Sequence, residues 1–211
     1  DYSYELMFAQ ALGNCKNGAL PMGIGVVTDM ATPALSRFGS DALREEFLAP
    51  VLAGEQCCSI AVSEAGAGSD VASIKTSARK DGGDYVINGS KTFITNSSHA
   101  GLVVVVARTG GEGAQGISLI VAEVAGLEGF ERGRVLKKIG QHGQDTRELH
   151  FTDMRVPAEN VLGEEGRGFY HLMEQLPQER LIVGVSCVAA MEACLDLPDG
   201  VTVTGADLSP D

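Results

Sequence analysis

The sequence predicts an α+β fold in which an antiparallel, barrel-like β-domain is flanked by helical segments. Helical periodicity covers the beginning and the end of the chain, and short apolar runs between glycine-rich turns fill the middle. These strands do not alternate with long helices, which argues against a doubly wound dinucleotide-binding fold. We expect residues 1–55 to close an N-terminal helical domain, 56–165 to form a middle β-domain, and 166–211 to begin a C-terminal helical domain with an irregular tail.

The first block contains two helix starts and one helix end. Thr32 followed by Pro33 is typical of an N-cap with proline at the first helical position. Ser40 can cap a second helix, and Gly54 can end it. The apolar residues of this second helix fall on one face, which we expect to be buried; they are Leu43, Phe47, Leu48, Val51 and Leu52.

Turn sequences divide the middle block into expected strands. Asn88-Gly89 and the glycine pairs that follow Asp81 and Thr109 are such turns, and this spacing favours an antiparallel barrel or sandwich. The stretch 71–78 is expected to continue as strand, so the glycines before it are not a dinucleotide fingerprint, which would need a helix there. The expected strands are Cys57–Ser63, Ile74–Ala78, Asp84–Asn88, Lys91–Thr95, Leu102–Ala107, Ile117–Val121, Gly129–Leu136 and Glu148–Thr152.

The last block is expected to hold two helices that meet at Pro177. Proline is most simply the first residue of the second helix, which would place Gln178, Glu179 and Arg180 in its first turn. From Pro198 onward the helical period is lost, which predicts a polar tail.

Charge and composition exclude several classes of function. A formal net charge of −12 argues against a nucleic-acid binder, whose phosphate contacts need a basic face. No apolar run reaches the roughly 18 residues of a membrane span, and basic residues do not cluster as a membrane-surface site requires. The 5 cysteines lack metal-site or redox spacing, so we expect reduced thiols in a reducing compartment. The scattered histidines predict no metal site.

The run from Ala61 to Asp70 is the segment that most directly predicts a ligand site. Gly66 and Gly68 alternate with alanine, and Ser69 follows at once. With no side chain in the way, such a turn can present backbone N–H groups and a hydroxyl to a phosphate. A tight turn that merely leaves a strand is the alternative interpretation.

Further motifs accompany this run in a fixed order along residues 20–195. They are Phe38-Gly39-Ser40 with the helix end at Gly54-Glu55, Ser63–Asp70, Asn88–Asn96, Asp145–Phe151, Arg155–Gly163 and Gly166–Phe169. In this order they resemble the acyl-CoA dehydrogenase family of flavoenzymes. The segment Leu176–Leu181 resembles the long-chain branch, in which the catalytic glutamate lies at this helix. The family's first and last helices have no counterpart in this sequence, so the resemblance implies a chain truncated at both ends.

The resemblance implies FAD-dependent α,β-dehydrogenation of an acyl-CoA thioester. Glu179 would remove the α-proton while the β-hydrogen leaves as hydride to N5 of FAD, and the electrons would pass to an electron-transfer flavoprotein. It also implies that the full-length protein is a homo-oligomer, a dimer or tetramer, in a bacterial cytoplasm or a mitochondrial matrix. The alternatives are a catalytically inactive β-domain that binds a CoA ester or a protein, and an acyl-CoA oxidase that uses oxygen.

The same resemblance implies two flavin segments and a substrate site. The expected flavin contacts are Ile60, Val62, Ser63, Gly68, Ser69, Phe93, Ile94 and Thr95. The expected substrate contacts are Ser69, Ala114, Tyr170, Pro177, Gln178 and Arg180. As alternatives, the serines could simply form turns, Phe93–Thr95 could be an ordinary alternating strand, and Arg180 could pair with a carboxylate of a neighbouring helix.

The sequence leaves the acidity of Glu179 open. A place in the first turn of a helix would lower the pKa of its carboxyl through the helix dipole. A desolvating acyl chain would raise that pKa. Glu179 could also be an exposed residue that only stabilises the start of the helix.

Overall fold

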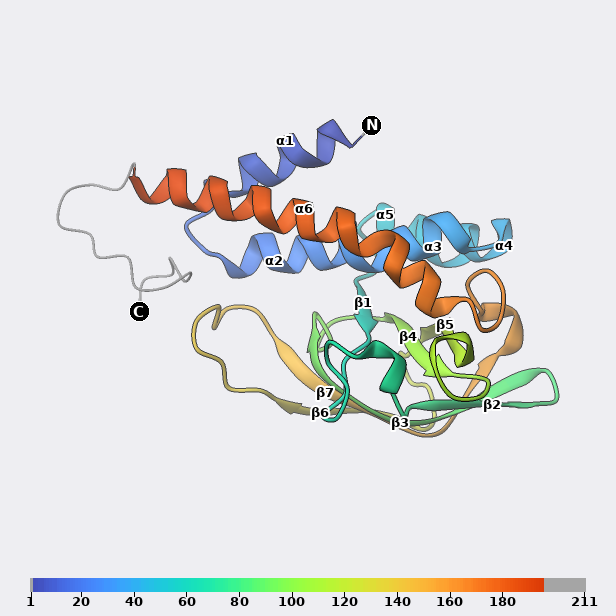
Figure 1. The fold of residues 1–211 in the computed structure, drawn as a ribbon. Coiled ribbons are helices and arrows are strands. Elements are labelled where there is room, and N and C mark those ends of the chain that lie inside the picture. Colours follow the sequence, from blue (N-terminus) through green and yellow to red (C-terminus); the bar gives the residue numbers. More distant parts are fainter. Residues whose placement is uncertain (1, 196–211) are drawn as a thin grey trace.

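A helical layer lies over a curled β-sheet in the computed structural model of the chain (Figure 1). The structure describes residues 2–195, so the irregular tail expected from Pro198 lies outside the described residues. Both ends of the described chain contribute to the helical layer, and the middle of the chain forms the sheet. The predicted α+β class with a barrel-like sheet is therefore confirmed.

The helices follow the expected order, and the cap at Ser40 is confirmed. The backbone N–H of Leu43 donates to Ser40 Oγ at 3.2 Å, and Gly54 adopts φ 77° just beyond the last turn. The elements are α1 (Ser3–Leu12), α2 (Ala19–Gly25), the π-helical turn η1 (Val26–Ala31), α3 (Thr32–Phe38), α4 (Asp41–Leu43), the π-helical turn η2 (Arg44–Leu48), α5 (Ala49–Leu52) and α6 (Gly168–Leu195).

The N-cap expected at Thr32 is wrong. The backbone stays helical through Ala31 and Thr32, so α2, η1 and α3 follow one another without a break. The Thr32 hydroxyl turns back along the helix and donates to the carbonyl of Val27 at 2.8 Å. A hydroxyl that bonds a carbonyl of the preceding turn is compatible with a helix interior, so this residue need not cap one.

The helix break expected at Pro177 is also wrong. α6 is one helix of 28 residues with Pro177 inside it. Proline removes one backbone hydrogen bond there. Neighbouring segments support this part of α6, because the Tyr2 hydroxyl donates to the carbonyl of Gln178 at 2.8 Å. Glu179 consequently lies in the middle of a helix, where the dipole of a helix start does not act.

The sheet has 7 strands in the order β1-β4-β2-β3-β7-β6, with β5 paired to β4. Most pairs are antiparallel as expected, but β1 runs parallel to β4, from Cys58 opposite Leu102 to Ala61 opposite Val105. The strands are β1 (Cys58–Ala61), β2 (Ser77–Asp81), β3 (Asp84–Thr95), β4 (Leu102–Arg108), β5 (Ile117–Glu123), β6 (Phe130–Val135) and β7 (Thr146–Pro157).

Two details of the strands differ between the sequence-based expectation and the structure. The turn predicted at Asn88-Gly89 is an irregularity inside the single long strand β3, where Gly89 has φ 148°. A β-carbon on Gly89 would lie 2.6 Å from the Thr76 hydroxyl oxygen, so the close approach of this segment requires glycine. The stretch expected to continue as strand after Asp70 forms the 3₁₀ turn η3 (Val71–Ser73), and β2 begins only at Ser77.

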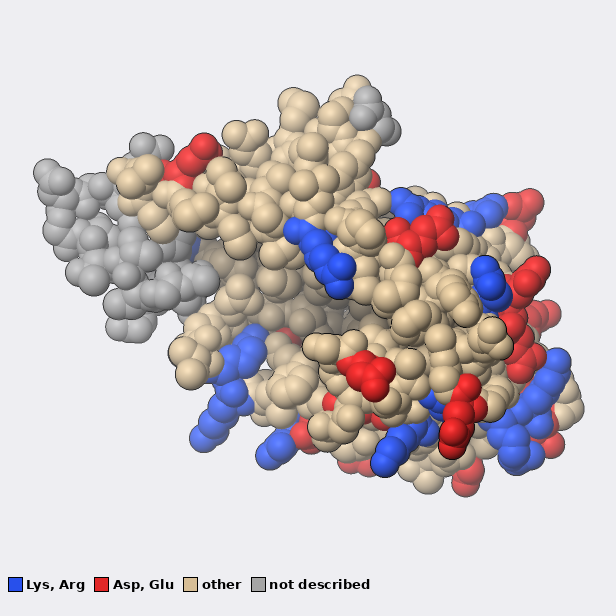
Figure 2. All heavy atoms as spheres, viewed as in Figure 1, with Lys and Arg blue, Asp and Glu red and all other residues tan. Residues whose placement is uncertain are grey.

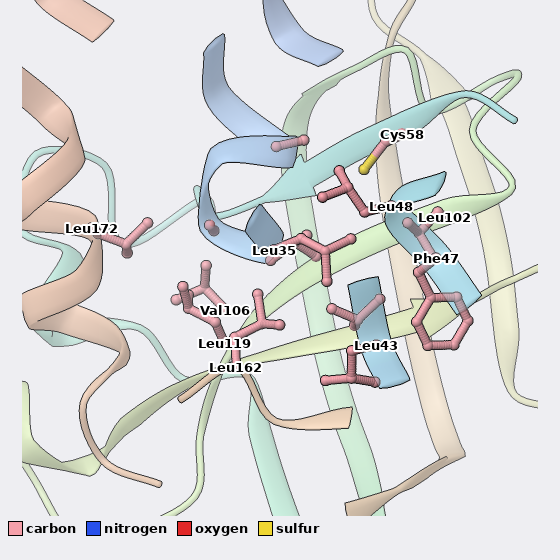
Figure 3. Close-up of a cluster of buried hydrophobic side chains, with 14 of the residues drawn as sticks. Leu35, Leu43, Phe47, Leu48, Cys58, Leu102, Val106, Leu119, Leu162 and Leu172 are labelled. Carbon is pink, nitrogen blue, oxygen red and sulfur yellow. The ribbon is translucent and has the colours of Figure 1, made fainter. Parts of the chain in front are cut away.

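Two hydrophobic clusters cover the two faces of the sheet. One packs the sheet against the helices and includes Leu35, Leu119 and Leu172 (Figure 3). The other fills the curled interior, with Tyr85 and Met154 among its buried members. Strands β4 and β5 are buried on both faces, which explains their uninterrupted apolar sequences.

The expected buried face of the second helix is confirmed except at its end, where Leu52 is 73% exposed.

All cysteines of the described chain carry free thiols. Within residues 2–195, no helix is both long and apolar enough to cross a bilayer. On the face shown in Figure 2, the surface over α1 and α6 carries few charged side chains. The exposed apolar residues of these two helices include Tyr4, Met7, Phe8, Leu181, Val188 and Met191.

Candidate functional site

The segment from Val62 to Ser69 leaves β1 as a tight, open turn. Glu64 and Ala67 exchange two backbone hydrogen bonds of 3.0 and 3.1 Å. Gly68 is exposed, and no atom lies within 4 Å of where its β-carbon would be. The backbone of this turn is therefore accessible to a ligand, as the glycine run predicts.

Phe93, in the second predicted flavin segment, has an unusual backbone conformation. Its φ is 61°, and the residue is 68% exposed. The register of β3 on β7 shifts between Lys91 and Ile94, and this bulge turns Phe93 out of the sheet. A bulky residue at positive φ costs about 1–2 kcal/mol, and such strain is concentrated at functional sites. An ordinary alternating strand therefore does not describe this segment.

The two segments predicted to contact a flavin are joined to each other. Ser59 Oγ donates to the carbonyl of Thr95 at 2.7 Å, and the N–H of Thr92 donates to the carbonyl of Ser63 at 2.9 Å. β1 and β3 are not neighbours in the order of the sheet, so these bonds join β3 to β1 and to the segment that follows β1 in addition to the pairing within the sheet. We call this junction of Ser59, Ser63, Thr92 and Thr95 the β1–β3 seam.

The predicted flavin residues in and next to the β1–β3 seam differ in their exposure to solvent. Val62 and Ser63 are half-buried, while Gly68 and Ser69 are exposed. Ile94 is buried in the interior cluster, so only its backbone can face a ligand at the seam. Asn96, just beyond β3, donates through Nδ2 to the carbonyl of Gly23 at 2.7 Å, which links the seam to α2 in the helical layer.

Glu179 is half-buried on α6, within the helical layer. Burial and the nearby negative charge of Asp29 raise the pKa of its carboxyl to about 7, and Arg180 only partly opposes them. Desolvation by the protein itself thus decides the question that the sequence leaves open. A carboxyl with a pKa near neutrality is suited to accept and release a proton at physiological pH.

An apolar cavity of about 200 Å³ opens between α1, α2 and α6. Asp29 and Glu5 provide carboxylates in a lining that is otherwise mostly apolar, with Phe8, Met22 and Ile182 among its members. Burial raises the pKa of Asp29, although a hydrogen bond from the Thr28 hydroxyl partly opposes this. The cavity is therefore suited to an apolar group.

A second, more open hollow contains two of the predicted substrate contacts, Pro177 and Gln178. The Gln178 side chain accepts a hydrogen bond from Arg37 at 2.6 Å and donates one to Glu5 at 3.3 Å. These bonds place Gln178 toward α1 and α3 and hold the middle of α6 against them.

The other predicted substrate contacts lie elsewhere on the helical layer and its junction with the sheet. Tyr170 is near the start of α6, with the Arg167 guanidinium 4.5 Å from the centre of its ring. Ala114 begins the 3₁₀ turn η4 (Ala114–Gly116), which contacts α6. Arg180 is exposed and belongs to none of the ion pairs found within residues 2–195, so the alternative pairing with a neighbouring helix is not observed there.

Asp29 and Lys91 were not predicted from the sequence. Asp29 raises the pKa of the predicted base Glu179, and Lys91 forms a hydrogen bond with the carbonyl of the predicted flavin residue Val62. Asp29 stands beside Val26, Val27 and Met30, and a lone carboxylate in such an apolar helix segment is a usable signal. Lys91 is buried at the position of β3 that precedes the bulge, but a single lysine in an expected strand gives no comparable signal.

Comparison with known proteins identifies the family. A model described as "Acyl-CoA dehydrogenase, middle domain" matches residues 59–154, from β1 through most of β7. The long-chain specific acyl-CoA dehydrogenase of Sus scrofa is 45% identical over 186 residues, which cover 87% of this chain and 42% of that protein. The chain belongs to the acyl-CoA dehydrogenase family. It spans about half the length, or less, of the relatives that it matches.

Solved structures agree with this assignment. An acyl-CoA dehydrogenase from Geobacillus kaustophilus matches with a TM-score of 0.86 and 45% identity, over 92% of this chain and 51% of that one. An acyl-CoA dehydrogenase from Bacillus anthracis, described as complexed with FAD, matches with a TM-score of 0.81 and 31% identity, over 87% of this chain and 31% of that one. The curled sheet and the helices over it are thus the arrangement found in other acyl-CoA dehydrogenases.

Proposed function

We propose that this chain supplies the flavin-contacting segments and the base of an FAD-dependent acyl-CoA dehydrogenase. The observation that carries the proposal is Glu179, a half-buried carboxyl whose pKa burial and Asp29 raise to about 7. It is on the helix that walls an apolar cavity, in a chain related to acyl-CoA dehydrogenases. The carboxyl would accept the α-proton of the bound thioester on one of its oxygens.

The β1–β3 seam fits a flavin. The open backbone around Gly68 leaves room for a pyrophosphate, and the Ser63 and Ser69 hydroxyls can form hydrogen bonds with the cofactor. The exposed ring of Phe93 can cover an aromatic face. FAD, when bound, supplies the acceptor for the β-hydrogen as hydride at N5. The relative described as complexed with FAD supports this choice of cofactor.

The substrate would be an acyl-CoA thioester whose acyl chain enters the cavity between α1, α2 and α6. Ser69, Ala114, Tyr170, Pro177, Gln178 and Arg180 are proposed to contact the thioester and the CoA part. The apolar lining would remove water from the acyl chain; Glu179 itself lies outside the lining, one turn before Ile182 on the same helix. Proton transfer would then be coupled to the departure of the β-hydrogen.

The remaining parts of the proposal concern the surroundings of the reaction. Electrons would pass to an electron-transfer flavoprotein, and the full-length protein would work as a homo-oligomer, a dimer or a tetramer. The free thiols and the mitochondrial relative support a reducing compartment, either a bacterial cytoplasm or a mitochondrial matrix.

A titration with FAD followed by acyl-CoA tests the proposal. The loaded protein should show flavin absorbance bands at about 370 and 450 nm, and acyl-CoA should bleach the longer-wavelength band. Glu179→Gln should bind FAD and resist bleaching, whereas Glu174→Gln, an exposed carboxylate on the same helix, should bleach normally. Normal bleaching of Glu179→Gln would exclude this base.

The same titration distinguishes the alternatives. Binding of acyl-CoA with no uptake of FAD would indicate a CoA-ester-binding domain without catalysis. Bleaching that reverses in air with stoichiometric hydrogen peroxide would indicate an oxidase.

A further inference from the structure

Lys91 places a positive charge in the interior of the sheet. Its side chain is inaccessible to solvent, and its ammonium donates to the Val62 carbonyl at 2.8 Å and to Glu64 Oε1 at 2.9 Å. Taking an ammonium out of water costs several kcal/mol, which these contacts must offset. A buried charge of this kind needs a reason beyond filling space.

Glu64 completes the arrangement from the other side. Its carboxylate accepts the backbone N–H of Lys75 at 2.7 Å and that of Thr76 at 2.9 Å, besides the Lys91 ammonium. Both oxygens are therefore used. Well-packed apolar residues often give equal or greater stability than a buried ion pair, so stability alone does not account for this pair.

The position of the pair points to the flavin segments. Val62 and Glu64 lie at the start of the open glycine turn, and Lys91 lies two residues before the exposed Phe93. The pair is next to the bond from Thr92 to Ser63 in the β1–β3 seam. It thus connects the turn, the 74–76 segment and the bulge of β3 at one point.

We propose that Lys91 and Glu64 are positioning residues that hold the glycine turn and Phe93 in the register that a flavin requires. The proposal rests on the proposed function, since it concerns the same cofactor. Neither side chain would touch the flavin. They act through the backbone of Val62 and Ser63 and through the bulge that presents Phe93.

The pair has an electronic effect as well as a geometric one. The carbonyl that Lys91 polarises and the N–H of Ser63 belong to the same peptide group. A hydrogen bond to the carbonyl makes the N–H of that group a stronger donor. If Ser63 N–H donates to the polar edge of the flavin, loss of Lys91 weakens a bond that favours the electron-rich reduced flavin. The reduction potential of the bound flavin should therefore fall.

Three variants separate this role from stability. Lys91→Met leaves the half-buried Glu64 carboxylate without its counter-charge, so it should lower the thermal midpoint of the protein without FAD. Lys91→Met combined with Glu64→Gln removes both charges and should recover most of that loss. Arg155→Met removes an exposed ion pair with Asp81 and Asp84, away from the seam, and serves as the control.

The measurements are FAD affinity, the spectrum of bound FAD and its midpoint potential. We expect the double variant to bind FAD about tenfold or more weakly, the loss typical of a charge-assisted hydrogen bond, and to show a lower midpoint potential. The Arg155→Met variant should match the wild type in all three. A double variant with wild-type affinity, spectrum and potential would overturn the proposal.

A readout without FAD distinguishes failure of this proposal from failure of the proposed function. If the wild type binds no FAD, the function fails, and amide hydrogen exchange still tests the positioning role. The Thr92 and Thr76 N–H groups should lose protection in the double variant while β4 and β5 keep theirs. Unchanged protection at Thr92 and Thr76 would refute a positioning role for the pair.

Discussion

The carboxyl of Glu179 on α6 lies close enough to that of Asp29 on η1 for the charge of Asp29 to raise its pKa. Burial is the larger cause, and the pKa of Asp29 is itself raised by burial. Two carboxylates in a half-buried place resist ionising together. The π-helical turn that carries Asp29 therefore helps to set the proton affinity of the proposed base.

Replacement of Asp29 by asparagine should lower the pKa of Glu179 and make it a base at lower pH. In the loaded enzyme, the acid limb of kcat/KM against pH should move to lower pH by a fraction of a unit to one unit. Glu5→Gln is the matched control, because Glu5 lines the same cavity but is not a principal cause of the shift at Glu179. A limb that does not move in Asp29→Asn would show that burial alone sets this pKa.

The raised pKa of Glu179 also predicts how stability depends on pH. The folded pKa of about 7 exceeds the ordinary value of 4.5, so folding favours the protonated form. The stability contributed by that form is complete below about pH 4.5 and is lost as pH rises through 7. Glu179→Gln stays neutral, so at pH 8 its free energy of unfolding should exceed that of the wild type by about 1–2 kcal/mol, after allowance for solvent screening.

Urea unfolding at pH 5, 6, 7 and 8 measures this difference. The advantage of Glu179→Gln should grow with pH across the series. Glu174→Gln, at an exposed position on the same helix, should show no such trend. An advantage that is the same at every pH would mean that Glu179 is not buried enough to resist ionisation.

Local signals predicted the elements whose residues are neighbours in sequence. The Ser40 cap and the apolar runs of β4 and β5 depend on contacts within a few residues or on burial on both faces, so they could be predicted. Pro177 and Thr32 misled because each is a local signal that the packing around it overrides. In α6, Tyr2 and Arg37 both form hydrogen bonds with Gln178, the residue directly after the proline, and hold the helix there.

The candidate site, like the fold, could be predicted only in part from the sequence. The resemblance implied a role for Glu179, but the position of Asp29 beside it depends on how η1 packs on α6, 150 residues away in sequence. Lys91 and Glu64 are 27 residues apart and meet only because the sheet curls. Such pairings are set by tertiary structure, and no periodicity in the sequence reports them.

The strained backbone of Phe93 predicts that stability and cofactor binding respond differently to its replacement. Asparagine tolerates positive φ better than phenylalanine, and the exposed ring contributes little burial. Phe93→Asn should therefore keep or raise the free energy of unfolding, by up to about 1 kcal/mol, while FAD affinity falls. Phe130→Asn, at a half-buried ring packed near Phe151, should cost about 2 kcal/mol. A large loss of stability in Phe93→Asn would show that the ring serves packing instead.

Two glycines of α6 should respond in opposite directions to the same substitution. A β-carbon on Gly168 would lie 2.7 Å from the backbone of Ser118, within the buried strand β5, so Gly168→Ala should cost about 1–3 kcal/mol. Nothing lies within 4 Å of that position on Gly184, so Gly184→Ala should gain about 1 kcal/mol from helix propensity alone. Urea unfolding of the two variants and the wild type measures both effects. Because the chemical change is identical, a Gly168→Ala protein as stable as Gly184→Ala would show that the start of α6 does not pack against β5, and the arrangement that carries Glu179 on α6 would have to be revised.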